Sequence, residues 1–335
     1  MKYDLPGGVV QRRVEVNSIE LDVLEAGPAD GPLIVLAHGF PETSWSWRHQ
    51  LLPLAAAGWH VVAPDQRGYA GSSKPTTVEE YGIRLLSGDL VALVDLLGGV
   101  DAKAVFVGHD WGALIVWDLA RLHPERCLAT IGVSVPFVDW PAPPTSIFRT
   151  LHPDTFFYML YFQEVGPAET ELGADPRKTM RRILYSASGD MPATEDSIMA
   201  QAQPRPAKGT GFLDVMVEPP NGVLPGWCSP KDLDVYTASF EESGFFGPVS
   251  WYRNLDANYV IMQDYPASRI THPTAFIGGS RDPVIARDLS GLDRMKTRLP
   301  NYLGGVIVEG AGHWTQQEQP EAFNDALLGF LSKVS

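Results

Sequence analysis

The run Gly108-His109-Asp110-Trp111-Gly112 decides how the rest of this chain is interpreted. It follows the apolar stretch 104–107 and precedes a helical pattern over 113–120, so the sequence predicts a strand, a tight turn and a helix. Small residues on both sides of the central position permit the strained backbone that exposes its side chain. The exposed group is therefore the carboxylate of Asp110, where a serine is the more usual nucleophile.

A carboxylate at this position suits a particular class of electrophile. A serine that attacked an sp3 carbon would form an ether, which ordinary hydrolysis does not cleave. A carboxylate that attacks the same carbon forms an ester, and an activated water can cleave that ester at the enzyme's own carbonyl. Asp110 therefore indicates substrates that can alkylate a carboxylate, namely epoxides or compounds with a carbon–halogen bond.

The bulk composition is that of an acidic globular protein. With 335 residues, 44% of them hydrophobic and 20% charged, the chain suits one large α/β domain with an insertion. The net charge of −14 disfavours binding to nucleic acid or to an anionic membrane surface.

The sequence also predicts a cytoplasmic location. The first residues lack the apolar segment of a signal peptide, and no stretch approaches the length of a membrane span. The two cysteines, Cys127 and Cys228, are far apart and have no metal-ligand spacing around them. We expect two free thiols in a reducing compartment.

Short apolar strands alternate with amphipathic helices in the first part of the chain, a rhythm typical of a mostly parallel sheet covered on both faces. The rhythm breaks over residues 136–248, which are aromatic, proline-rich and mainly helical, with a loop-like stretch over 203–226. We predict a core from residues 1–135 and 249–335, with 136–248 as an inserted helical cap. The cap would cover the carboxyl ends of the strands, where open α/β sheets bind ligands.

Two further polar residues follow predicted strands near the end of the chain. Asp282 comes just after the strand-like run 273–278, and His313 comes just after the next strand. Both loops leave the sheet at the edge that carries Asp110, so the three side chains can converge. His313 would activate water, and Asp282 would fix its tautomer and stabilise the imidazolium. Asp139, after an earlier strand, is the alternative acid.

The run His38-Gly39-Phe40-Pro41 follows another apolar strand and predicts half of an oxyanion hole. The backbone N–H of Phe40, with that of Trp111, would face the carboxyl oxygen of Asp110 during ester hydrolysis. A simple tight turn is the alternative, and Pro41 is a candidate cis proline. We expect His38 and His109 to hold the loops through hydrogen bonds. The residues expected to border the substrate pocket are His38, Pro41, Phe157 and Trp314.

Epoxide opening needs a proton donor, because the leaving oxygen departs as a basic alkoxide that stays tethered. A tyrosine hydroxyl, with an ordinary pKa of about 10, is protonated at neutral pH and can serve. The aromatic stretches 156–163 and 251–254 contain the candidates Tyr158, Tyr161 and Tyr252. Their spacing alone does not separate a donor from a packing residue.

At these motifs the chain resembles the α/β-hydrolase-fold epoxide hydrolases, especially the soluble type of mammals, plants and mycobacteria. The resemblance implies an eight-stranded, mostly parallel sheet with helices on both faces and an inserted helical cap. It implies Tyr158 and Tyr252 as the donors to the epoxide oxygen, with Tyr161 as a neighbour. The phosphatase domain of the mammalian members has no counterpart, so we expect no metal and no cofactor. The matching runs are 38–41, 108–112, 158–164, 247–254 and 312–316.

Haloalkane and haloacid dehalogenases are the nearest alternatives, since they use the same type of nucleophile. Haloalkane dehalogenases hold the halide with a second side-chain donor, whereas the side chain of Phe40 donates nothing. Fluoroacetate dehalogenases carry an arginine where Trp111 stands. A catalytically inactive binding protein is disfavoured by the complete set of candidate groups.

We therefore predict an epoxide hydrolase that forms vicinal diols through an ester on Asp110. Its expected partner is a small epoxide, with no nucleic acid and no membrane, and its expected state is a monomer or a homodimer.

Overall fold

The structure is a computed structural model that describes residues 4–192, 205–288 and 290–334. Its centre is one eight-stranded sheet with the strand order β1-β2-β4-β3-β5-β6-β7-β8. The antiparallel hairpin of β1 (Val9–Val16) and β2 (Ile19–Ala26) forms one edge, and β2 pairs antiparallel with β4 (His60–Pro64). All other pairs are parallel, and they involve β3 (Leu33–Ala37), β5 (Ala104–His109), β6 (Cys127–Val133), β7 (Thr274–Gly279) and β8 (Tyr302–Val308).

Burial explains why these segments form strands. Every residue of β3, β4, β5 and β7 is buried, as central strands require when both faces of a sheet are covered. In the edge strand β1, by contrast, Val14 and Val16 are buried while Arg13 and Glu15 are exposed. Asn17 and Ser18, both at positive φ, form the turn between β1 and β2.

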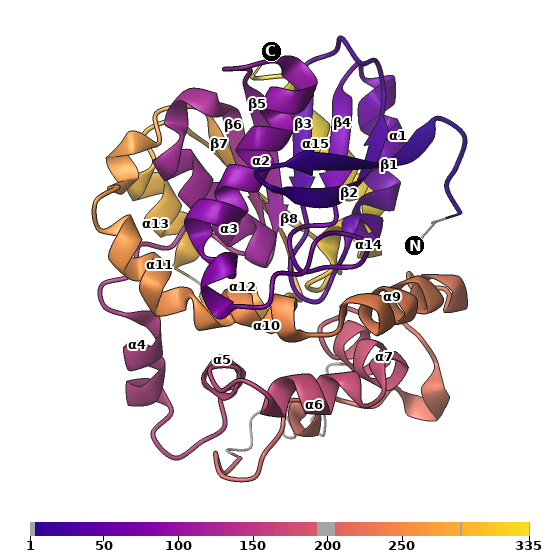
Figure 1. Ribbon diagram of the computed structural model, residues 1–335, viewed down its shortest axis with the longest axis vertical. Coiled ribbons are helices and arrows are strands. Elements are labelled where there is room, and N and C mark those ends of the chain that lie inside the picture. Colours follow the sequence, from indigo (N-terminus) through magenta and orange to yellow (C-terminus); the bar gives the residue numbers. More distant parts are fainter. Residues whose placement is uncertain (1–3, 193–204, 289, 335) are drawn as a thin grey trace.

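Helices cover both faces of the sheet (Figure 1). On one face α1 (Arg48–Ala56) packs with α15 (Pro320–Leu331), and on the other α2 (Ile83–Gly98) packs with α3 (Trp111–Leu122). The predicted fold class is thus confirmed. The remaining short helices around the sheet are η1 (Ser44–Trp47), η2 (Val78–Tyr81), η3 (Pro124–Arg126), α12 (Pro283–Arg287), α13 (Gly291–Arg298) and α14 (Thr315–Glu318).

A helical segment between β6 and β7, residues 134–273 and here called the cap segment, lies across one end of the sheet in the lower half of Figure 1. Its described helices are α4 (Pro144–Leu151), α5 (Tyr158–Tyr161), α6 (Pro167–Gly173), α7 (Pro176–Ser186), α9 (Pro230–Ser243), α10 (Phe246–Arg253) and α11 (Leu255–Met262). It also has the 3-10 turns η4 (Leu213–Val215), η5 (Pro220–Gly222) and η6 (Ala267–Arg269).

The predicted loop-like stretch is irregular where the structure describes it. Residues 205–226 contain η4, η5 and an isolated bridge from Pro206 to Thr155. Residues 203 and 204 lie outside the described residues.

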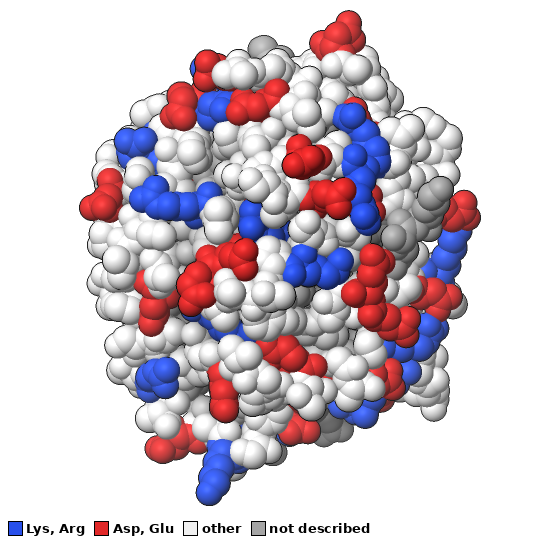
Figure 2. All heavy atoms as spheres, viewed as in Figure 1, with Lys and Arg blue, Asp and Glu red and all other residues white. Residues whose placement is uncertain are grey.

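Charge is distributed over the surface. Figure 2 shows acidic and basic side chains interspersed on the visible face, as expected from a net charge of −14 that is spread along the chain. Among the residues described, no helix is long and apolar enough to cross a membrane. Cys127 and Cys228 are both buried and unpaired, as predicted.

Candidate active site

Asp110 occupies a strained turn between β5 and α3. Its φ of 52° lies in the left-handed region, which residues other than glycine rarely adopt. The turn is also tightly packed, since a Cβ on Gly112 would lie 2.1 Å from the carbonyl oxygen of Ala37. The predicted strand, turn and helix are confirmed, and the turn places Asp110 at the carboxyl end of β5.

One carboxylate oxygen of Asp110 is bound by the backbone. The N–H of Phe40 donates to Oδ1 of Asp110 at 2.8 Å. Gly39 permits this approach, because a Cβ there would lie 2.5 Å from the Cβ of Asp110. Trp111 is the first residue of α3, so its N–H has no acceptor within the helix and lies at the positive end of the helix dipole.

The other carboxylate oxygen faces the histidine. Nε2 of His313 lies 3.5 Å from Oδ2 of Asp110, and its Nδ1 lies 3.1 and 3.2 Å from the two carboxylate oxygens of Asp282. Asp282 follows β7 and caps α12 by accepting the N–H of Val284 at 2.8 Å. The three residues that the sequence places after separate strands thus lie together.

The charges in this trio depend on one another. Burial alone would lower the pKa of His313, but the carboxylates of Asp282 and Asp110 outweigh burial and raise it well above its usual value. Burial alone would raise the pKa of Asp282, but His313 and hydrogen bonds from Val284 and Ser134 outweigh burial and lower it. In the free protein, His313 is therefore an imidazolium held by two carboxylates.

A second buried pair, His109 and Glu42, lies next to this trio. Nδ1 of His109 is 2.5 Å from Oε2 of Glu42, and its Nε2 is 2.7 Å from the carbonyl oxygen of His313. Both ring nitrogens of His109 therefore face an oxygen that can accept a hydrogen bond. Burial alone would raise the pKa of Glu42, but His109 lowers it to about 2. Glu42 also accepts the Gly39 N–H at 3.0 Å, so the pair links three loops of the site.

His38 and Pro41, two of the predicted pocket residues, shape the Phe40 loop. Nδ1 of His38 donates to the carbonyl of Gly39 at 2.9 Å, and its Nε2 accepts the N–H of Gln66 at 3.0 Å. Burial lowers the pKa of His38 to about 4, so this imidazole is neutral. Pro41 is buried and follows a cis peptide bond, as predicted. The expected loop-holding role of His38 is visible in its hydrogen bonds.

The other two predicted pocket residues, Trp314 and Phe157, contact the rings of His313 and Tyr158 respectively. Trp314 is buried and donates its indole N–H to the carbonyl of Leu184 at 2.9 Å. Phe157 is half-buried, with its ring stacked on His152 at 4.5 Å and its centroid 5.3 Å from Tyr158.

Tyr158 and Tyr252 lie together beside the Asp110 loop. Their ring centroids are 5.8 Å apart, and the ring of Tyr252 lies 5.3 Å from Phe40 and 5.0 Å from Trp111. Burial, followed by the proximity of Tyr158 and Asp110, raises the pKa of Tyr252 well above its usual value. The Tyr252 hydroxyl is therefore a protonated donor across the neutral range.

Tyr161 has different neighbours. Its ring lies 5.6 Å from Phe156 and 6.0 Å from Phe162. Burial and a hydrogen bond with Glu171 raise its pKa. The geometry therefore pairs Tyr158 with Tyr252 and sets Tyr161 beside them.

Comparison with known proteins agrees with this geometry. Residues 32–165 match the family described as the alpha/beta hydrolase fold. The chain is 43% identical to Epoxide hydrolase A of Mycobacterium tuberculosis over 97% of its own length and 98% of that protein. The chain belongs to the epoxide hydrolases of the α/β-hydrolase fold.

Two solved structures place this epoxide hydrolase in the same family. The crystal structure of Epoxide Hydrolase A from Mycobacterium thermoresistibile is 44% identical with a TM-score of 0.87, and the match covers 97% of this chain and 98% of that one. An epoxide hydrolase from an endophytic Streptomyces is 36% identical with a TM-score of 0.90, covering 98% and 96% of the two chains.

Two aromatic residues that the sequence did not single out complete the tyrosine cluster of this epoxide hydrolase. The ring of Phe162 lies 5.0 Å from Tyr252 and 5.7 Å from Tyr158. The ring of Phe212 lies 5.6 Å from Tyr158 and 5.1 Å from Phe162. Helical spacing would have found Phe162, four residues after Tyr158. Phe212 lies in the irregular stretch, where no pattern indicates which side chains point inward.

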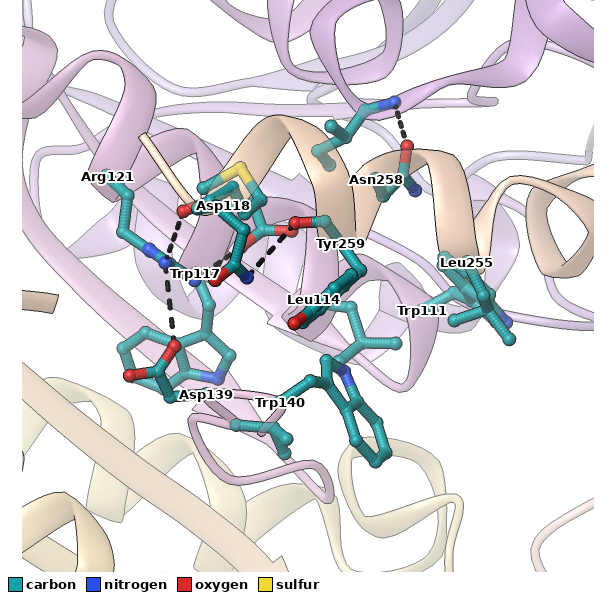
Figure 3. Close-up of a pocket in the computed structure, with 14 residues that line it drawn as sticks. Trp111, Leu114, Trp117, Asp118, Arg121, Asp139, Trp140, Leu255, Asn258 and Tyr259 are labelled. Atoms are coloured by element: carbon teal, nitrogen blue, oxygen red, sulfur yellow. Dashed lines mark hydrogen bonds and ion pairs between the residues drawn. The ribbon is translucent and has the colours of Figure 1, made fainter. Parts of the chain in front are cut away.

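A separate pocket of about 40 Å³ also borders Trp111 (Figure 3). Its walls come from α3, α11 and the chain that follows β6. At its polar end Arg121 lies 3.5 Å from Asp118 and 3.6 Å from Asp139. Asp139, the alternative acid in the sequence, thus pairs with Arg121, whereas Asp282 is the carboxylate that contacts His313. In the described part of the chain, no cluster of three or more His, Cys, Asp or Glu residues is arranged to hold a metal ion.

Proposed function

We propose that this protein converts epoxides to vicinal diols in two chemical steps, with an ester on Asp110 between them. One observation carries the proposal: two tyrosines meet beside a carboxylate whose other neighbours are a backbone N–H and a histidine. Ring opening requires a nucleophile and a proton donor, and ester hydrolysis requires a base and an oxyanion site. These neighbouring residues include a group for each task.

In the first step, Oδ2 of Asp110 attacks one epoxide carbon while Oδ1 stays bound to the N–H of Phe40. The carbon–oxygen bond of the ring breaks, and Tyr158 and Tyr252 hydrogen-bond the leaving oxygen. One of them transfers its proton, because the developing alkoxide is far more basic than a tyrosinate. The product is a glycol monoester of Asp110.

Ester formation changes the charge next to His313. The esterified Asp110 is neutral and no longer raises the pKa of His313, whereas Asp282 still does. His313 therefore releases its proton more readily in the ester, and this proton restores the tyrosine. One proton has then moved from the imidazolium to the new hydroxyl group, and the neutral imidazole is a base.

In the second step, His313 takes a proton from a water molecule, and the hydroxide attacks the carbonyl carbon of the ester. Negative charge develops on Oδ1, where the N–H of Phe40 already lies and where the N–H of Trp111 would add a second donor. Collapse of this intermediate breaks the bond between the carbonyl carbon and the glycol oxygen, and the imidazolium of His313 protonates that oxygen to release the diol. The carboxylic acid of Asp110 then returns its proton to His313, which restores the starting state. We propose that no cofactor takes part in either step.

A dehalogenase would use the same nucleophile but would need side-chain donors for a halide. The residue at the Phe40 position donates only its backbone N–H, and that group is bound to Asp110. The two tyrosine hydroxyls suit an oxygen that must accept a proton, which a halide does not need. This contrast supports an epoxide as the substrate.

The test is to trap the ester in a variant that lacks the base. His313→Gln, incubated with styrene oxide, should gain the mass of the whole epoxide, with the adduct on Asp110 after peptide mapping. The double variant Asp110→Asn/His313→Gln is the control and should gain nothing. An adduct formed only from a haloalkane, with release of halide, would make the protein a dehalogenase. Absence of an adduct with a panel of epoxides would also refute the proposal.

A further inference from the structure

The loop that carries His313 is fastened to the cap segment. The N–H of His313 donates to the carbonyl of Ala187 at 2.8 Å, and the indole N–H of Trp314 donates to the carbonyl of Leu184 at 2.9 Å. Leu184 is in α7, and Ala187 begins the turn after it. Two contacts that fix the histidine loop therefore come from the cap segment and not from the sheet.

The same turn, residues 187–190 and here called the junction turn, also contacts the loop of the orienting acid. Arg281, which precedes Asp282, donates from Nη1 to the carbonyl of Gly189 at 2.8 Å. The loop of His313 and the loop of Asp282 therefore both contact the junction turn of the cap segment.

The side chain of Glu318 also joins the junction turn to the loop of His313. Its Oε2 accepts the N–H of Gly189 at 2.8 Å and the N–H of Gly312 at 2.9 Å, and its Oε1 accepts the N–H of Trp314 at 3.1 Å. Gly312 and Trp314 are the two neighbours of His313. One carboxylate therefore binds the backbone on both sides of the histidine and ties it to the junction turn.

The backbones of the junction turn and of the loop that carries His313 are packed too closely to shift independently. A Cβ on Gly189 would lie 2.2 Å from the carbonyl oxygen of Gly310, and a Cβ on Gly312 would lie 2.2 Å from the nitrogen of Gly189. The junction turn and the histidine loop are therefore in direct backbone contact, with space for glycine alone at both positions.

Holding this carboxylate in place is energetically unfavourable. Burial raises the pKa of Glu318 to about 7 and the nearby Asp190 contributes, even though the three N–H donors lower it. A neutral side chain of similar size would avoid that burial of charge. The geometry, in which three backbone donors converge on one side chain, indicates a task for it other than simple packing.

We propose that Glu318, acting with the junction turn, is the positioning residue that aims the imidazole of His313 at the ester on Asp110. This proposal rests on the two-step mechanism above. Ester hydrolysis depends on it more than ring opening, because Asp110 is held by its own turn and by the N–H of Phe40. The tyrosines are held by the aromatic cluster, which Glu318 does not contact.

The test compares the two chemical steps in Glu318→Gln by rapid mixing with styrene oxide. The amide would turn a donor NH2 toward backbone donors, so the histidine loop loses at least one of its two hydrogen bonds to this side chain. We expect ester decay to slow about tenfold to a hundredfold, because small misplacements of catalytic groups have effects of this size. The rate of ester formation should stay within about threefold of wild type. The ester should then accumulate and be visible by mass. Glu321→Gln, the same change at an exposed site three residues later, is the matched control and should behave as wild type.

A second variant disturbs the junction from the cap side. Gly189→Ala places a methyl group against the carbonyl of Gly310 and should slow ester decay in the same selective way. Equal losses in both steps, unchanged ester decay, or loss of the fold in both variants would assign the junction to stability alone and overturn the proposal. A wild-type protein that forms no ester with any epoxide would instead refute the two-step mechanism, so the two failures are distinguishable.

Discussion

The sheet and the cap segment hold their catalytic groups in different ways. Asp110, Asp282 and His313 each follow a strand, and each is fixed by short hydrogen bonds to backbone or to one another. Tyr158 and Tyr252 come from two helices of the cap segment, and their rings lie in an aromatic cluster with centroid distances of 5.0 to 5.8 Å. From this difference we infer that, in the proposed mechanism, the sheet supplies the groups for the ester chemistry and the cap segment supplies the donors to the epoxide oxygen.

Loss of the nucleophile is the most severe way to test the role of the sheet. Asp110→Ala should lower turnover of styrene oxide by more than about 10⁴-fold, because the ester cannot form. The fold should persist, since the substitution leaves the backbone contacts of the turn intact. Turnover and thermal unfolding are the measurements. Substantial residual turnover would mean that water attacks the epoxide directly and that the sheet does not supply the nucleophile.

Removal of the tyrosine hydroxyls tests the role of the cap segment. Tyr158→Phe and Tyr252→Phe should each slow ester formation about tenfold to a hundredfold, and the double variant by about 10³-fold or more, since proton donation is lost. Ester decay should stay near the wild-type rate. Rapid mixing separates the two rates. Tyr161→Phe is the matched control, and an equally large effect there would undo the division between a donor pair and a neighbour.

The pH dependence of ester formation and of ester decay should distinguish the groups of the cap segment from those of the sheet. Ester decay needs neutral His313, so its rate should fall about tenfold per pH unit below the pKa of His313 in the ester. Because the esterified Asp110 no longer raises that pKa, the fall should begin at a lower pH than the pKa of His313 in the free protein. Ester formation should show no loss up to about pH 10, because burial keeps the pKa of Tyr252 well above its ordinary value. If both rates fall together at one pH, a single group governs both regions.

The smallest expected effect concerns the pocket where α3 meets the cap segment. Burial outweighs Arg121 and raises the pKa of Asp118 from 3.8 to about 7, so this group contributes stability below pH 4 that is lost as pH rises through 7. Asp118→Asn should therefore raise the free energy of unfolding at pH 8 by on the order of a few kcal/mol, and change it little at pH 4.

Both chemical steps should be unaffected by Asp118→Asn, since Asp118 pairs with Arg121 and, among the residues that line this pocket, Trp111 is the one that belongs to the site. Chemical denaturation at the two pH values is the measurement. Asp325→Asn, at an exposed site on α15, is the control and should change stability by less than about 0.5 kcal/mol. Destabilisation of Asp118→Asn at pH 8 would mean that the ion pair with Arg121 outweighs the burial of charge.

Much of the sheet and its catalytic groups could be predicted from the sequence. Asp110, Asp282 and His313 each follow an apolar run that forms a strand. The runs of β5 and β7 are buried because both faces of the sheet are covered there, whereas β8 is an edge strand and mostly not buried. Small residues around Asp110 predict the strained turn that its φ of 52° confirms. These features are local, so the sequence pattern contains them.

Contacts between distant segments could not be predicted in the same way. Glu318 and Gly189 are 129 residues apart, and nothing in either neighbourhood indicates that a carboxylate will meet that backbone. Glu42 follows a recognised motif, but its partner His109 is 67 residues away. Phe212 lies in an irregular stretch without periodicity. Local patterns determine whether a side chain is buried, and they leave open which partner it meets.

The most direct test of the two-step mechanism is a single turnover in water enriched in 18O. With enzyme in excess over styrene oxide, the diol should contain no label, because its new oxygen comes from Asp110. The peptide that contains Asp110 should gain one 18O atom when water cleaves the ester at its carbonyl. A labelled diol together with an unlabelled Asp110 peptide would show direct attack by water and would contradict the mechanism.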